Sequence, residues 1–177
     1  MSGRRPITLE KLKQEKRDLG ASFNQEYGRA CLIGCGIVPT ELLDSSGSST
    51  QVFDMGSDII RLRTDHPLVG RIFFMEGEKS LGQIMLGRGA DSDVTIPDYP
   101  ISKHHCTFQW SKEGYILSDM GSTNGTFVEF ERLEPNDPCL IEDRTRVVLG
   151  RFGFRFYKSG QSLLEDEDPL SDFTPFG

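Results

Sequence analysis

From about residue 52 onward, short apolar runs alternate with turn-forming residues, and this pattern constrains the fold more than any other feature of the chain. Short strands with turns about every 8 to 12 residues are typical of an antiparallel sandwich or barrel. Alternation is clearest at Phe152, Phe154 and Phe156, which are separated by arginine and glycine. One face of that strand is therefore expected to be buried and the other to face water. The predicted strands are 58–63, 71–75, 83–86, 93–96, 105–110, 115–118, 126–130, 139–141, 146–149 and 153–157.

The segment that precedes this β-rich region has a different character. Residues 8–29 are predicted to form a helix with Thr8 as its N-cap, because three leucines and Phe23 give it a partial apolar stripe. Its many Lys and Glu residues favour a solvated helix that docks weakly on the rest of the chain or on a partner. Residues 30–43 contain two glycines and a proline, so irregular structure is expected there. Residues 44–50 are rich in Ser and Gly and have the composition of a flexible linker.

These differences predict three regions along the chain. Residues 1–51 form an N-terminal extension with a helix and a Ser/Gly-rich linker, and residues 52–158 form the β domain. Residues 159–177 are polar and acidic and have little to bury. We therefore expect that last segment to be a flexible tail, disordered or loosely laid on the domain.

The composition argues against several classes of function. The 177 residues carry a formal net charge of −7, which argues against nonspecific nucleic-acid binding because such binding requires a basic face. No apolar run approaches the roughly 20 residues that span a bilayer, and no secretory signal is visible, so no membrane partner is expected. We expect a cytoplasmic protein whose four cysteines are reduced. Cys31 and Cys35 lie four residues apart, but no second Cys or His pair is near enough to complete a zinc site.

Three polar clusters interrupt the apolar runs in the middle of the chain. They are Gly-Arg at 87–88, Ser-Lys-His-His at 102–105 and Gly-Ser-Thr-Asn-Gly-Thr at 121–126. Loops between strands can bring such side chains together at one end of a β-scaffold. An arginine fork, two hydroxyls and an asparagine amide suit the oxygens of a phosphate on a peptide, and they do not suit a metal ion.

The order and spacing of these clusters resemble the forkhead-associated (FHA) family, whose pattern is Gly-Arg, then Ser-x-x-His, then Asn-Gly. The resemblance covers about residues 55–158, more than half of the chain. It implies a mainly β fold, a two-sheet antiparallel β-sandwich of the FHA/SMAD-like type. It also implies a noncatalytic module that binds phosphothreonine peptides, discriminates against phosphoserine and acts as an adaptor in Ser/Thr kinase signalling.

The resemblance also assigns binding roles to five residues. Arg88 would contact the phosphate directly, and the Ser102 hydroxyl would donate to a phosphate oxygen. Lys103 would add either its charge or only a backbone N–H, and both readings stay open. Thr123 would point a second hydroxyl toward the phosphate, and Asn124 would hold the peptide main chain through its amide.

Three further residues are expected to structure the site. Gly87 lets the backbone turn before the arginine, and Gly125 supplies a backbone conformation closed to other residues. By resemblance, His105 braces the loops from beneath without touching ligand. We reject His105 as a general base for Ser102, because the sequence places no acidic residue to orient the ring and no oxyanion-hole motif is visible. The chain is therefore expected not to be an enzyme and to use no cofactor.

The expected partners are a protein or peptide phosphorylated on threonine and an upstream Ser/Thr kinase. The alternative is an FHA scaffold or oligomerisation protein that binds independently of phosphorylation, which the intact set of polar residues disfavours. Thr174 lies next to a proline in an acidic segment, and Thr50 lies in the Ser-rich linker. Either is a candidate for phosphorylation and intramolecular binding to the chain's own site, although ordinary polar segments are the plainer interpretation.

Overall fold

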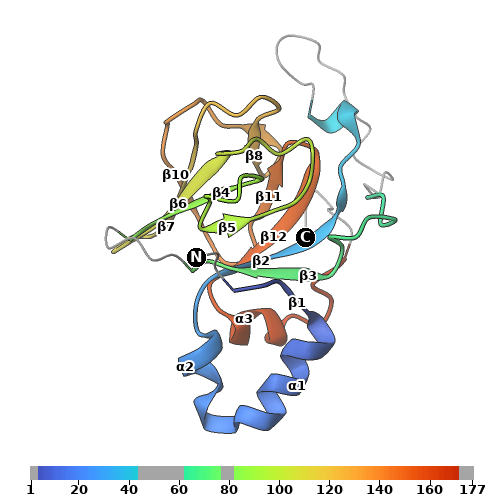
Figure 1. The fold of residues 1–177 in the computed structure, drawn as a ribbon, viewed down its shortest axis with the longest axis vertical. Helices are drawn as coiled ribbons and strands as arrows, with labels where there is room; N and C mark the ends of the chain where they lie inside the picture. Colours follow the sequence, from blue (N-terminus) through green and yellow to red (C-terminus); the bar gives the residue numbers. More distant parts are fainter. Residues whose placement is uncertain (1–3, 44–61, 77–81, 172–177) are drawn as a thin grey trace.

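The computed structural model describes residues 4–43, 62–76 and 82–171, and its strands form two sheets packed face to face (Figure 1). The larger sheet has the strand order β1 (Ile7–Thr8), β3 (Arg71–Phe74), β2 (Cys31–Ile37), β12 (Phe152–Tyr157), β11 (Arg146–Leu149), β8 (Thr126–Val128) and β9 (Glu131–Arg132). The smaller sheet has the order β10 (Cys139–Ile141), β7 (Gly114–Asp119), β6 (Cys106–Ser111), β4 (Gln83–Gly87) and β5 (Val94–Thr95).

The predicted two-sheet β-sandwich is confirmed, with one parallel pair, β4 and β5, among antiparallel ones. The aromatic face of the last strand lies at the centre of the core, where Phe152, Phe154 and Phe156 are fully buried. Phe108 of the smaller sheet stacks on Phe156 with 5.9 Å between the ring centroids. The other face, expected to meet water, is exposed at Arg151 but not along the strand, because Gly153 is buried and Arg155 is only partly exposed and donates to the Ser171 hydroxyl at 3.0 Å.

Most of the predicted strands occur within two residues of their expected ends. The short strands β1 and β9 and the longer β2 were not predicted. The predicted strand 58–63 lies mostly outside the described residues. Thr50 and Thr174 also lie outside them, so intramolecular binding by either residue stays a prediction.

The segment 30–43 contains a strand of the larger sheet, so the prediction of irregular structure there is wrong. β2 pairs with β12 on one side and with β3 on the other, and its residues from Cys31 to Gly36 are all buried. A strand buried on both faces shows no alternation of apolar and polar residues, which removes the usual sequence signal. Its glycines serve close packing, since a Cβ on Gly34 would lie 2.0 Å from the Leu68 carbonyl oxygen.

The predicted helix over 8–29 is interrupted. α1 (Leu9–Leu19) begins at the predicted N-cap, where the Thr8 hydroxyl accepts a hydrogen bond from the Lys11 N–H at 3.2 Å. It ends at Gly20, whose φ of 51° lies in the left-handed region. The chain then continues through a short 3-10 turn into a second helix.

This second helix, α2 (Phe23–Tyr27), is the part of the N-terminal segment that docks most deeply. Both of its aromatic residues are buried, and their rings stack with 5.2 Å between centroids. By contrast, α1 buries only Leu12. The two 3-10 turns of the described chain are Gly20–Ser22 and Thr40–Leu42.

The C-terminal segment predicted as a flexible tail contains a docked helix, α3 (Gly160–Glu165), capped by the Ser159 hydroxyl. Leu163 is fully buried in the same apolar cluster as Phe23. The prediction of disorder is therefore wrong for the described part of the segment, because its few apolar residues meet a surface built by the distant N-terminal helices. Residues 172–177 lie outside the described part.

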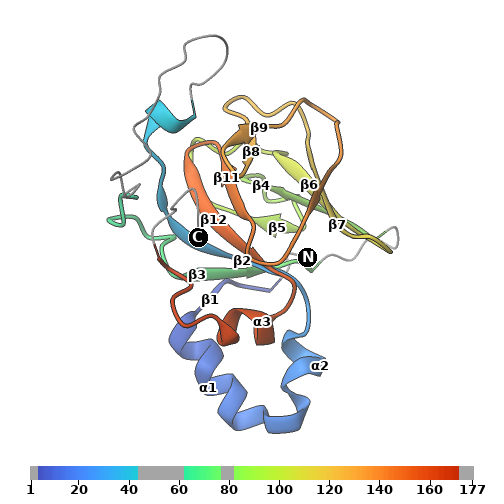
Figure 2. The same cartoon turned by 180° about the vertical axis from the view of Figure 1, so that it is seen from behind.

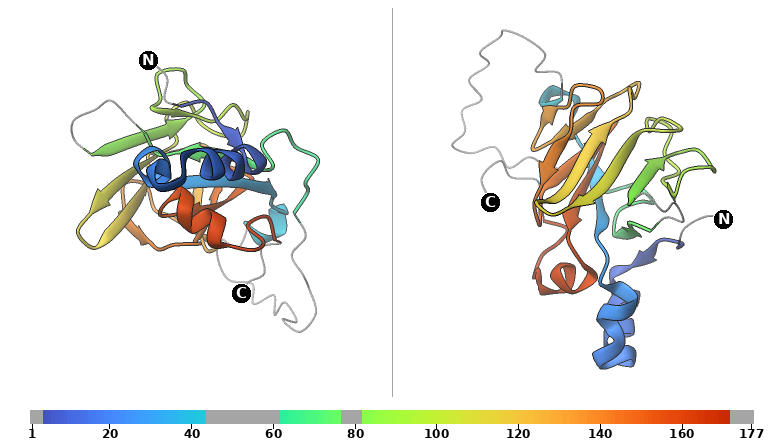
Figure 3. Two further views of the ribbon diagram at one scale, coloured as in Figure 1. Left: turned by 90° about the horizontal axis from the view of Figure 1, so that it is seen from below. Right: turned by 90° about the vertical axis from the view of Figure 1, so that its left-hand side faces the viewer.

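The helices α1, α2 and α3 form a helical layer over the outer face of the larger sheet (Figure 1). Figure 3 shows α1 and α3 side by side when the molecule is seen from below, and the Lys16 ammonium donates to the Gln161 side chain at 2.6 Å between them. No helix of the described residues covers the smaller sheet (Figure 2). None of the described helices is long and apolar enough to cross a bilayer.

Candidate functional site

The polar clusters of the sequence meet at one end of the sandwich, which we call the loop rim. It comprises residues 87–105, which run from the end of β4 to the start of β6, and residues 119–126, which join β7 to β8. The side chains of each segment hydrogen-bond to the backbone of the other, as the following contacts show. The loop rim thus holds the predicted binding residues in one connected network.

Arg88 is anchored at its base and exposed at its tip. Its backbone N–H donates to the Ser102 carbonyl at 2.9 Å, and its Nε donates to the Ile101 carbonyl at 3.1 Å. The guanidinium carbon lies 5.8 Å from the centroid of the Tyr99 ring. These contacts leave the two terminal NH₂ groups without a hydrogen bond to the described residues, so they are available to an oxyanion.

Ser102 connects the second and third clusters directly. Its hydroxyl oxygen accepts a hydrogen bond from the Thr123 N–H at 3.0 Å. A hydroxyl that accepts one bond still has its own proton to donate. The donor of Ser102 and the exposed hydroxyl of Thr123 therefore lie at the same rim, beside the loop that anchors Arg88.

His105 lies fully buried beneath the rim and ties its two segments together. Its Nδ1 accepts from the Ser102 N–H at 3.0 Å, and its Nε2 faces the Gly125 carbonyl at 2.9 Å. Both contacts are satisfied by a neutral ring that carries its proton on Nε2. Burial lowers the pKa of His105, against the opposing effects of the Gly125 carbonyl and Asp119. A lowered pKa favours the neutral ring, which this double contact requires.

Asn124 and Gly125 shape the second segment of the rim. The Asn124 side-chain amide donates to the Pro100 carbonyl at 2.8 Å, which fixes the amide across the gap between the loops. Gly125 has a φ of 93°, in the left-handed region that favours glycine. A Cβ there would also lie 3.0 Å from the Arg132 guanidinium, so both conformation and space restrict this position.

Gly87 is restricted by space rather than by the turn that the sequence suggested. A Cβ on Gly87 would lie 2.0 Å from the Lys103 carbonyl oxygen. That same carbonyl accepts from the Gly89 N–H at 3.0 Å and from the Ser92 hydroxyl at 2.9 Å. The backbone of Lys103 thus orders the first loop, while its side chain is exposed.

Asp119 is a site-structuring residue that the sequence reasoning missed. Its buried carboxylate accepts from the N–H groups of Gly121 and Ser122 at 2.9 and 3.1 Å. It also accepts from the hydroxyls of Ser122 and Thr126 at 2.5 and 2.6 Å. Burial raises the pKa of Asp119, but these hydrogen bonds outweigh burial and hold it below the ordinary value. The sequence signal was an acid two residues before Gly-Ser, typical of a turn whose carboxylate accepts backbone N–H groups.

Comparison with known families agrees with this geometry. Residues 84–150 match the family model for the FHA domain. The chain contains an FHA domain. The matched segment includes the whole loop rim, but it leaves out β2, β12 and the helical layer.

The relatives include proteins of Mycobacterium and Corynebacterium. The glycogen accumulation regulator GarA of Mycobacterium tuberculosis is 33% identical over 81 residues, which are 46% of this chain and 48% of GarA. An oxoglutarate dehydrogenase inhibitor of Corynebacterium jeikeium is 26% identical over 113 residues, which are 64% of this chain and 73% of that protein. An ABC transporter ATP-binding/permease protein of M. tuberculosis is 32% identical over 101 residues, but these are only 11% of its length.

Among solved structures, the FHA domain of an Arabidopsis thaliana protein aligns with a TM-score of 0.49 at 17% identity. That alignment covers 73% of this chain and 84% of the Arabidopsis chain. The N-terminal FHA domain of Rad53p from S. cerevisiae aligns with a TM-score of 0.44 at 19% identity, over 51% of this chain and 86% of that chain.

Proposed function

We propose that this chain is a noncatalytic module that binds phosphothreonine peptides and acts as an adaptor in Ser/Thr kinase signalling. The observation that carries the proposal is the connected loop rim, which gathers Arg88, Ser102, Thr123 and Asn124 from loops far apart in the sequence. A phosphothreonine adds nearly two negative charges and three strong acceptor oxygens. The arginine fork and the two hydroxyls supply the donors that such a group requires.

Each rim residue has a role in this proposal. Arg88 and Ser102 hold the phosphate oxygens, Thr123 adds a second hydroxyl, and Lys103 adds charge or a backbone N–H. Asn124 holds the peptide main chain with its second N–H and its carbonyl oxygen, while its first N–H stays on the loop. Because the loops are already tied together, they lose little conformational freedom when a peptide binds. A short peptide held this way is expected to bind near micromolar, about −8 kcal/mol.

The names of two relatives, a regulator and an inhibitor, support a role exerted by binding. A cytoplasmic location is part of the proposal, and the free thiols of the four cysteines are consistent with it. Burial raises the pKa of the Cys31, Cys35 and Cys106 thiols, which keeps them unreactive.

We further propose that the described residues between 7 and 171 fold as one unit, in place of the predicted division at residues 52 and 158. The contacts that favour this larger unit are the pairing of β1 and β2 with β3 and the docking of α3 against α2.

The test is calorimetry of the full chain with three matched peptides that carry phosphothreonine, phosphoserine or unmodified threonine. We expect phosphothreonine to bind most tightly, phosphoserine about 10- to 200-fold more weakly because it lacks one methyl group, and threonine not measurably. Equal binding of all three peptides would contradict the proposal and would favour the phosphorylation-independent scaffold.

A further inference from the structure

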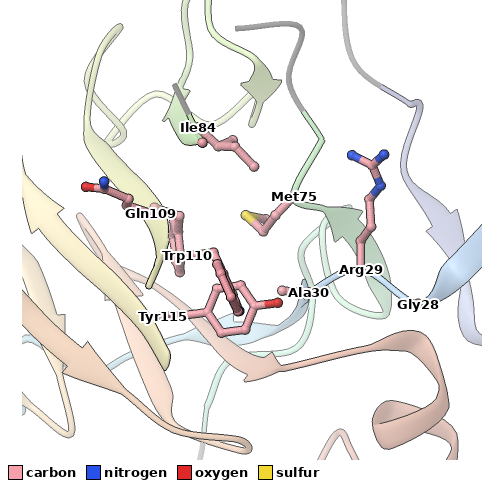
Figure 4. A pocket seen from close by; sticks show the side chains of 10 residues that line it. Gly28, Arg29, Ala30, Met75, Ile84, Gln109, Trp110 and Tyr115 are labelled. Carbon is pink, nitrogen blue, oxygen red and sulfur yellow. The ribbon is translucent and has the colours of Figure 1, made fainter. Parts of the chain in front are cut away.

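A hollow of about 230 Å³ opens beside the end of β6 that lies away from the loop rim. Figure 4 shows the side chains that line it. β6 begins next to His105 of the rim and reaches the hollow at Trp110. Trp110 is five positions along the chain from His105, which corresponds to about 17 Å at 3.3 Å per residue. The hollow is therefore separate from the proposed phosphate site. Its apolar lining consists mainly of Met75, Ile84, Phe108, Trp110 and Tyr115.

Trp110 makes this end of the sandwich unusual. It is the chain's single tryptophan, and 63% of it is exposed. It lies opposite Tyr115 in the β6–β7 pair, and Figure 4 shows the two side chains together on one wall of the hollow, with Met75 facing them. Exposed tryptophan and tyrosine beside an apolar recess are typical anchors of protein interfaces.

Arg29 gives the hollow a charge preference. It is exposed, and it makes no hydrogen bond or ion pair with the described residues. The backbone next to Arg29 is anchored, because the Ala30 carbonyl accepts the Met75 N–H at 2.8 Å. Figure 4 shows Arg29 standing across the hollow from Trp110. A guanidinium that pairs with none of the described residues, beside an apolar recess, complements a carboxylate carried next to a large apolar side chain.

We propose that this hollow, the Trp110 groove, is a second docking site that binds a partner segment with Asp or Glu close to a large apolar residue. The apolar side chain packs against Trp110, Tyr115 and Met75, and the carboxylate meets Arg29. The exposed Gln109 side chain at the edge can pair with the segment's backbone. This binding does not require phosphate.

The two sites can act on one partner. A single extended segment would need at least about five residues to span roughly 17 Å between the rim and the groove, and a folded partner can present two separate segments. Joining two weak contacts in one partner raises the overall affinity, by about 10²- to 10⁴-fold in favourable geometries. The groove would then select among partners that carry the same phosphorylated threonine.

The experiment is selection of an unphosphorylated random-peptide display library on the full chain. The test variants are Arg29→Glu and Trp110→Ala. Arg17→Glu on the exposed side of α1 is the matched control for charge reversal, and Arg88→Ala is the control for the loop rim. Selected peptides that lack tryptophan are then titrated by following the fluorescence of Trp110, the chain's only tryptophan.

We expect the selected peptides to pair Asp or Glu with Leu, Ile, Met or Phe and to shift Trp110 emission to shorter wavelength. Arg29→Glu should weaken them at least about tenfold, a change worth about 1.4 kcal/mol, and Trp110→Ala should abolish retention of the peptides. Arg17→Glu and Arg88→Ala should leave their binding unchanged. Selection of no sequence, selection without acidic residues, or equal binding to Arg29→Glu would overturn the proposal. Phosphothreonine affinity is measured separately, so the proposal for the Trp110 groove and the proposal for the loop rim can each be refuted independently.

Discussion

The loop rim and the helical layer are built from opposite kinds of contact. In the rim, partly exposed polar side chains such as Arg88 and Ser102 are held by hydrogen bonds to neighbouring loops. In the layer, Leu12, Phe23 and Leu163 are fully buried against the larger sheet. Removing an exposed polar side chain leaves no cavity, whereas removing a buried apolar one does. The rim should therefore govern binding, and the layer should govern stability.

Phe23→Ala in the helical layer should have the largest effect. The lost ring leaves a cavity against Tyr27, and such truncations cost about 3–5 kcal/mol of unfolding free energy. Urea denaturation measures this loss, and Asn24→Ala, at the exposed neighbouring position, should change it by less than about 0.5 kcal/mol. The phosphopeptide affinity of the folded variant should match that of the wild type. A large loss of affinity with intact stability would break the comparison.

Arg88→Ala should show the reverse behaviour. We expect it to cost about 2–5 kcal/mol of phosphopeptide binding, because it removes the guanidinium that holds the phosphate in our proposal. Its unfolding free energy should stay within about 0.5 kcal/mol of wild type. Calorimetry with one phosphothreonine peptide measures the loss of binding. The control is Arg63→Ala, whose exposed side chain pairs with Asp65 and is not one of the proposed binding residues. Undiminished affinity in Arg88→Ala would be incompatible with the proposed site.

Gly125→Ala tests whether the rim is held in a restricted backbone conformation. A side chain at a φ of 93° costs about 1–3 kcal/mol, and the Arg132 guanidinium adds crowding. Gly121→Ala is the matched control, since its φ is 73° but a Cβ there would meet nothing within 4 Å. Thermal unfolding of both variants should show the larger loss for Gly125→Ala. Equal losses would mean that the contact with Arg132 carries no energy.

His105 should give the smallest effect, a dependence of stability on pH. Because burial lowers its pKa in the folded protein, the unfolded chain takes up the proton first as pH falls. The contribution of His105 is therefore complete above about pH 6.5, the ordinary value, and declines as pH falls below it. Urea denaturation between pH 7.5 and 5.5 should show this decline, and His105→Gln should reduce the slope. An identical slope in the variant would assign the pH dependence to other groups.

The sequence predicted the loop rim better than the strands and helices that support it. The motif residues lie on local turns, and the spacing of short alternating strands made both the sandwich and the order of the loops predictable. The capping hydroxyl of Thr8 was predicted for the same reason, because it depends on its nearest neighbours. Features decided within a few residues were therefore recoverable from sequence.

The features that were missed depend on distant segments. β2 is buried on both faces, so it shows no alternation, and Gly34 is needed only because the Leu68 backbone passes close to it. α3 was not predicted because its segment is acidic. Its Leu163 is buried because the N-terminal helices supply an apolar surface. Asp119 belongs to a recognisable turn, but its bond to Thr126 closes a loop that local reasoning does not foresee.

The central claim is that the loop rim, and not the helical layer, receives a phosphothreonine. Its most direct test is an NMR titration of the full chain with a phosphothreonine peptide and its unmodified counterpart. We predict saturable amide shifts at residues 88–89, 102–103 and 121–125 with the phosphorylated peptide only, and none in α1, α2 or α3. Shifts centred on the helical layer, or the same shifts with the unmodified peptide, would contradict the account.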